Sequence, residues 1–212
     1  MLAHVCRTWL AAAVVLALAW PAAARAQGNG PGTWQIEAGA GVGIPVNSDL
    51  SDFVNAGPDF DVLVGYQFHE RIGVNIYGGV GLLSGKDDTD GQTAAAKFPD
   101  QTIWRYGAGA EISLTKPGNA LVALFGVGLG GATVNTGSYE FLGAGFLAPE
   151  GTVSTSFSSL IDLKLLYKVN PSFAIGAGAE WLLVFSADTI DPSRQNKTLS
   201  YLPVKAFVRW MQ

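Results

Sequence analysis

The chain has 212 residues, of which 49% are hydrophobic, 14% are charged and 27 are glycine, and its formal net charge is −4. Soluble domains average about 25% charged residues and about 7% glycine, so this chain carries too few charges for a disordered protein and is unusually rich in glycine. Beyond residue 30 no run of about 20 apolar residues occurs, which excludes a membrane-spanning helix there.

The first 26 residues have the pattern of a secretory signal peptide. Arg7 supplies the positive charge, residues 10–20 form an apolar core, and residues 24–26 (Ala-Arg-Ala) have the form of a cleavage site. The core is about 11 residues long, shorter than the ~17 needed to cross a bilayer, which favours a signal peptide over a membrane anchor. We expect cleavage before Gln27.

The segment 27–212 is expected to form one acidic domain. Cleavage removes the only cysteine, Cys6, and with it any thiolate metal ligand or disulfide. It also removes Arg7 and Arg25, which leaves 11 basic and 17 acidic residues, a net charge of −6. Nucleic-acid binding requires a basic surface, so we expect no nucleic-acid partner.

The dominant hydrophobic period after residue 30 is two, which is typical of β-strands rather than helices. In the first segment, apolar residues from Trp34 to Ile44 alternate with Gln35, Glu37 and glycines. We count eight such strands, at 34–44, 59–68, 72–82, 104–114, 121–129, 157–167, 173–183 and 202–210.

The connections between these strands are alternately long and short. In chain order they are 45–57, 69–71, 83–100, 115–119, 132–156, 168–172 and 184–199. This alternation places all the long loops at one end of an antiparallel meander and all the tight turns at the other. Outer-membrane barrels have this asymmetry, with short periplasmic turns and longer extracellular loops.

The two faces of the strands differ in a way that indicates a membrane barrel. One face is large and apolar, whereas the other carries glycine and scattered charge. The interior of an eight-stranded barrel is only just wide enough for side chains, so the apolar face would overfill it and glycine fits it. The sequence therefore predicts an all-β fold, an eight-stranded antiparallel up-and-down transmembrane β-barrel with its apolar face outward.

Aromatic residues gather at both ends of the predicted strands, as expected for side chains at the lipid headgroups. At the turn end we assign Trp34, Phe68, Tyr167, Phe173 and Trp210 to one girdle, and at the loop end Phe60, Trp104, Trp181 and Tyr201 to the other.

On these patterns the chain resembles the small bacterial outer-membrane barrels of the OmpA-like or opacity-porin-like group. The resemblance implies a place in the outer membrane of a Gram-negative cell, in contact with lipid and lipopolysaccharide, with both termini in the periplasm. It also implies insertion by the barrel-assembly machinery, for which members carry an aromatic-rich last strand. Tyr201, Phe207 and Trp210 are similar to that signal.

Nine ionisable residues fall on the predicted inward face: Glu37, Asp61, Arg105, Glu111, Asp162, Lys164, Glu180, Lys205 and Arg209. Buried charges are tolerated when they are paired and hydrogen-bonded, so we expect an internal network. Glu37 with Arg209, and Glu180 with Lys205, are the expected pairs. The network either fills the barrel as a structural element or lines a narrow path for ions or small solutes.

An enzyme that modifies lipids is a third and weaker hypothesis. Such chemistry needs a nucleophile activated by a base, typically serine with histidine. The only histidine after the signal segment is His69, in a tight turn at the end opposite to that expected for an outer-leaflet site. We therefore expect no enzyme activity, no cofactor and no metal site.

The long loops are the remaining candidates for function, through an extracellular ligand. Asp87, Asp88 and Asp90 lack the ligand spacing of a twelve-residue calcium loop and are expected to be solvated. The segment Phe141–Leu147 is unusually apolar for a loop, so it covers the barrel mouth, binds a hydrophobic ligand or contacts another protein.

Overall fold

The computed structural model describes residues 31–88, 96–137, 140–141, 152–187 and 197–212. The predicted signal peptide and its cleavage site lie outside these residues. Within the described residues no helix is long and apolar enough to cross a membrane.

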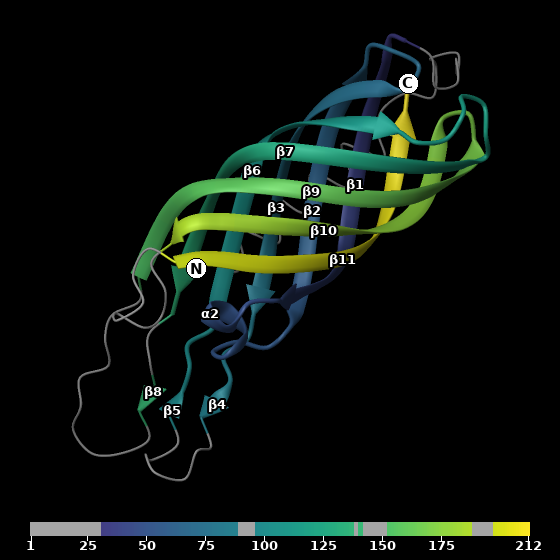
Figure 1. The fold of residues 1–212 in the computed structure, drawn as a ribbon. Helices are drawn as coiled ribbons and strands as arrows, with labels where there is room; N and C mark the ends of the chain where they lie inside the picture. The colour runs from purple at the N-terminus through teal and green to yellow at the C-terminus, as the bar shows by residue number, and fades with distance from the viewer. Residues whose placement is uncertain (1–30, 89–95, 138–139, 142–151, 188–196) are drawn as a thin grey trace, which may run out of the picture.

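Eight long strands form a closed barrel (Figure 1). They are β1 (Thr33–Pro45), β2 (Gly57–Gln67), β3 (Ile72–Leu83), β6 (Gln101–Ser113), β7 (Leu121–Thr136), β9 (Thr152–Asn170), β10 (Phe173–Ala187) and β11 (Lys197–Met211). Each pairs antiparallel with its neighbours in the chain, and β1 pairs with β11 to close the ring. The predicted fold, an eight-stranded up-and-down barrel, is confirmed.

Three tight connections lie at one end of the barrel, which we call the turn end. In the β9–β10 turn the Asn170 side chain accepts a hydrogen bond from the Ser172 amide at 2.9 Å. In the β6–β7 turn Gly118 has a φ of 88°, a left-handed conformation that favours glycine. The other end, the loop end, carries the long connections.

Alternation of the side chains sorts the apolar residues outward, as the sequence predicts. Ile76 on β3 is 63% exposed and Leu129 on β7 is 61% exposed, although both are fully apolar. Glycines occupy inward positions where neighbouring atoms leave no room for a side chain. A Cβ on Gly79 would lie 2.8 Å from the Arg105 guanidinium carbon and 2.8 Å from the Phe60 carbonyl oxygen.

Strands β7 and β9 are longer than the sequence predicts, with 16 and 19 residues. Their ladder runs to the pair Thr136 and Thr152, well inside the predicted loop 132–156. The expected loop boundaries were wrong because they were set where the apolar alternation ends. Thr133 and Thr155, whose hydroxyls lie 3.0 Å apart, show that the ladder continues with polar side chains.

The long loops contain structure that the sequence does not predict. A four-residue helix, α2 (Ser48–Ser51), follows β1. Three two-residue strands, β4 (Asp87–Asp88), β5 (Ala96–Lys97) and β8 (Glu140–Phe141), form a small separate sheet from two different loops. Figure 1 shows this small sheet beyond the loop end, the same end at which α2 lies.

Candidate functional site

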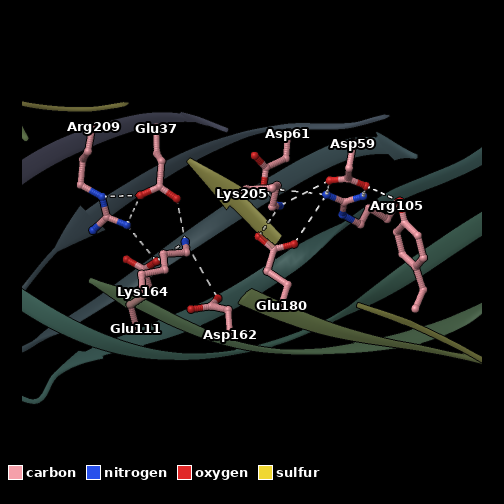
Figure 2. Close-up of polar contacts among 11 residues, drawn as sticks. Glu37, Asp59, Asp61, Arg105, Glu111, Asp162, Lys164, Glu180, Lys205 and Arg209 are labelled. Carbon is pink, nitrogen blue, oxygen red and sulfur yellow. Dashed lines mark hydrogen bonds and ion pairs between the residues drawn. The ribbon is translucent and has the colours of Figure 1, made fainter. Parts of the chain in front are cut away.

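The barrel interior is the candidate functional site because it gathers the predicted ionisable side chains. All nine are buried or nearly so, the most open being Asp61, whose side chain is 11% exposed. They come from six strands, and Figure 2 shows that they form two groups along the bore.

The first group, the turn-side cluster, consists of Gln35, Glu37, Glu111, Lys164 and Arg209. Arg209 donates from Nε to Glu37 Oε2 at 2.6 Å, from Nη2 to Glu111 at 3.0 Å and from Nη1 to Gln35 at 3.0 Å. Lys164 Nζ lies 2.7 Å from Glu37 and 2.8 Å from Glu111. Two carboxylates and two cations balance, so the cluster is neutral and richly hydrogen-bonded, as buried ions require.

The second group, the loop-side cluster, consists of Asp59, Asp61, Arg105, Glu180 and Lys205. Arg105 binds Asp59 with two parallel hydrogen bonds of 2.8 and 2.6 Å, the bidentate geometry that suits a carboxylate. Lys205 Nζ lies 2.6 Å from Glu180 and forms a close ion pair with Asp61. Three carboxylates meet two cations, so this cluster carries one excess negative charge when all its members are ionised.

Phe207 separates the two clusters. Its ring lies between Lys164 Nζ, 5.3 Å from the ring centroid, and Lys205 Nζ, at 5.5 Å. Both distances are within the range of cation–π attraction. The aromatic side chain is 2% exposed, so it lies buried in the bore between the two lysines.

Asp162 adds a further negative charge beside the clusters. Its nearest cation, Lys164, lies 4.0 Å away, and it stands opposite Glu180 in the β9–β10 register. Asp162 Oδ1 and Glu180 Oε2 have no hydrogen-bond partner among the described residues. Together with Asp61 they border a small cavity of about 10 Å³, which is room for one water molecule.

Asp59 is the residue that sequence reasoning missed. It is fully buried, holds Arg105, and accepts a hydrogen bond from the Tyr201 hydroxyl at 2.7 Å. The sequence contained the signal, because Asp59 stands two residues before Asp61 on the same strand and therefore faces the same side. With Asp59 the interior holds six carboxylates and four cations.

Tyr201 corrects the predicted loop-end girdle. It is 0% exposed and points into the bore, between Gly43 and Gly81, where a Cβ would collide with its ring. Tyr201 is four residues before Lys205 on β11, so strand alternation puts both on the inward face. Tyr201 was assigned to the girdle because it lies near the end of the strand, but its side chain is on the inward face.

The other girdle residues lie on the outer surface. Trp34, Phe68, Tyr167 and Trp210 at the turn end, and Phe60, Trp104 and Trp181 at the loop end, are each 40–58% exposed. Phe173 is half-buried because its ring packs edge-on against Trp210, with centroids 5.9 Å apart. Trp181 donates a hydrogen bond from its indole nitrogen to the Ser200 hydroxyl at 2.7 Å.

An apolar layer, which we call the plug, closes the loop end of the bore. Leu50 of α2 and Val54, which follows it, are 0% and 1% exposed and pack against inward residues of the strands. The strand residues of this layer are Leu83, Ile103, Ala132, Val134, Leu160, Leu182, Val184, Leu199 and Tyr201. The Asn47 side chain holds this segment against β11, because it donates a hydrogen bond to the Thr198 carbonyl oxygen and accepts one from the Ser200 amide.

The residues considered for catalysis lie far apart. His69 is exposed in the β2–β3 turn, where its Nδ1 accepts a hydrogen bond from the Arg71 amide at 3.3 Å. Ser154, Ser156, Ser158 and Ser159 lie on the loop-end half of β9. The structure therefore places the histidine and these serines at opposite ends of the barrel.

The loop residues singled out from sequence are described only in part. Asp87 is exposed on β4, whose partner strand is β5, whereas Asp90 lies outside the described residues. Phe141 belongs to β8, and 142–147 lie outside. Among the described residues no group of three or more histidine, cysteine, aspartate or glutamate side chains could hold a metal ion.

Comparison with known proteins finds similarity in fold and not in sequence. No protein-family model matches the chain, and no curated protein matches it significantly. Among solved structures, Neisserial surface protein A (NspA) has a TM-score of 0.57 at 14% identity, over 84% of this chain and 98% of that one.

Two further structures agree. The outer membrane protein OprG from Pseudomonas aeruginosa has a TM-score of 0.56 at 14% identity, over 89% of this chain and 99% of that one. A major outer membrane protein from Thermus thermophilus has a TM-score of 0.57 at 10% identity, over 85% of this chain and 99% of that one. The closed barrel with its apolar outer face is thus the fold of the small outer-membrane β-barrels.

Proposed function

We propose that this chain is an integral outer-membrane protein with a structural role and a surface role carried by its long loops, and that it is not an enzyme. The observation that carries the proposal is the filled bore. From the loop end inward, the plug, the loop-side cluster, Phe207 and the turn-side cluster follow one another. A bore filled with paired ions and packed apolar side chains supports a role that is carried by the long loops and not by the interior.

The filling favours this role over the narrow passage that the sequence left open. An ion crossing the barrel would have to displace Leu50 and Val54, break the Arg105–Asp59 pair and pass Phe207. Breaking a buried ion pair costs roughly 3–5 kcal/mol, because the remaining charge is left without a partner.

Conductance across a planar bilayer tests the proposal. We expect the purified barrel to give no stable unitary currents. A stable current that changes on Arg105→Ala would contradict the proposal and support a narrow path through the loop-side cluster. Shaving intact cells with protease should cleave the long loops while the barrel remains in the outer-membrane fraction; recovery of the protein elsewhere would contradict its location.

The proposal extends to the termini and to the surface partner. We propose that residues 1–26 are removed before Gln27, which N-terminal sequencing of the membrane-extracted protein would check. The surface role can be tested by replacing 142–147 with a Gly/Ser segment of equal length. We expect the barrel to fold as before and binding of cells to their target surface to fall.

A further inference from the structure

The turn end of the barrel opens into a pocket of about 40 Å³, which we call the turn-end pocket. Residues from all eight long strands line it. Its floor is formed by Arg209 and Glu111 of the turn-side cluster, and its wall includes the apolar side chains Val122, Leu124 and Leu166. The pocket combines an apolar wall with a polar floor and a mainly polar rim.

Besides Arg209 on the floor, three cations line this pocket, two from tight turns and one from a strand. Arg71 lies in the β2–β3 turn, Lys116 in the β6–β7 turn, and Lys168 near the end of β9. None of the three forms an ion pair within the described part of the chain. Arg105, Lys164, Lys205 and Arg209 in the bore, by contrast, each have a carboxylate within 4.0 Å.

The charge of the pocket favours a dianion. Among its lining residues Glu70 is the one acid not already paired in the bore, so the three cations leave a balance of +2. This excess is notable in a chain whose formal net charge is −4. A carboxylate would neutralise only one of these charges, whereas a phosphate monoester carries about −1.5 to −2 at pH 7.

We propose that the turn-end pocket binds a phosphate monoester with a small apolar organic group. The phosphate lies among Arg71, Lys116 and Lys168, where the arginine supplies a planar fork of donors and the lysines supply point charges. The organic group packs on the apolar wall. This site lies at the end of the barrel opposite the long loops, so it goes beyond the proposed surface role and does not depend on it.

Calorimetric titration of the barrel refolded in detergent micelles tests the site, with phenyl phosphate, inorganic phosphate and benzoate as probes. We expect phenyl phosphate to bind most tightly, because its ring covers the wall, and benzoate most weakly, because it carries a single charge. Each affinity should fall as sodium chloride is added, because salt screens exposed charges.

Single substitutions Arg71→Gln, Lys116→Gln and Lys168→Gln should each weaken phenyl phosphate binding roughly threefold, and the triple variant roughly thirtyfold. Glu70→Gln should tighten binding, because it removes the opposing charge. Lys86→Gln is the matched control, since Lys86 lies at the loop end and donates to the Ser51 carbonyl oxygen. It should leave the affinity unchanged.

Three outcomes would overturn the proposal: no saturable binding of phenyl phosphate, equal binding by the wild type and the triple variant, or benzoate binding as tightly as phenyl phosphate. The heat-dependent gel shift of each variant reports whether the barrel is folded. Because Arg71 and Lys116 are exposed, their variants should keep that shift.

Discussion

At the residue scale, the interior depends on pairs that fail when one partner is lost. Arg105 and Asp59 are both essentially unexposed and hold each other through two hydrogen bonds. Removing one partner strands the other in the bore, whereas removing both leaves no buried charge of that pair. Replacing one residue of the pair should therefore lower the free energy of unfolding more than replacing both residues does.

Arg105→Ala is expected to lower the free energy of unfolding by roughly 3–5 kcal/mol. Urea titration in lipid vesicles, followed by tryptophan fluorescence, measures this change. The double variant Asp59→Asn, Arg105→Gln should recover part of the loss. Lys116→Ala, an exposed cation, is the control and should change stability by no more than about 0.5 kcal/mol. An Arg105 variant as mild as this control would argue that the pair is not buried in the folded barrel.

Two neighbouring glycines on β3 provide a test of which face points inward. A Cβ on Gly79 would press on Arg105 and on the Phe60 carbonyl, but a Cβ on Gly78 would meet its nearest atom at 3.8 Å. Gly79→Ala should cost about 1–3 kcal/mol through overpacking, and Gly78→Ala should be neutral or slightly stabilising. The same unfolding titration compares them; equal effects would contradict the assigned faces.

At the element scale, the strands can be predicted from the sequence, whereas the segment that holds α2 cannot. Strand alternation places Glu37 and Arg209 on the inward face of β1 and β11, and closure of the ring puts them in register. The sequence alone therefore predicts their pairing. The alternation also covers Asp59 and Tyr201, which sequence reasoning overlooked or misassigned although the same period applies to them.

The plug could not be predicted in this way. Helix α2 has only four residues, too few for a hydrophobic period, and Leu50 and Val54 are buried by contacts with strands far away in the sequence. The loop-end extension of β7 and β9 was missed for a related reason. Outside the lipid a strand needs no apolar face, so its serines and threonines give no alternating signal.

Leu50→Ala should loosen the plug without unfolding the barrel. Truncating a buried leucine costs about 2–5 kcal/mol, and this cost falls on the short segment that holds α2 and not on the strand ladders of the barrel. Hydrogen exchange should accelerate at the Phe53 and Val54 amides, which donate to the Leu50 carbonyl, while β-strand amides stay protected. Val46→Ala, at a half-exposed position, is the control. Unchanged exchange at Val54 would indicate that the plug does not depend on Leu50.

At the scale of the whole molecule, the barrel reverses the usual order of a globular protein, with ions inside and apolar side chains outside. This arrangement is stable only where lipid covers the outer face. The cost of a charge on that face should then depend on its depth in the bilayer.

Two positions on β9 measure this depth dependence. Leu163 lies near the middle of the barrel and is 56% exposed, whereas Val153 lies at the loop end and is 68% exposed. Leu163→Arg should lower stability in vesicles by about 2–4 kcal/mol, and Val153→Arg by no more than about 1 kcal/mol. If both substitutions cost the same, the lipid boundary does not lie between them.

The length of β9 sets how far the protein rises above the cell surface. A strand of 19 residues spans roughly 63 Å at about 3.3 Å per residue, and a tilt of about 40° leaves roughly 48 Å of height. The hydrocarbon layer takes up about 30 Å of that height. The remaining height of roughly 18 Å lets the β7–β9 ladder, which runs to Thr136 and Thr152, extend beyond the hydrocarbon layer into the headgroup region.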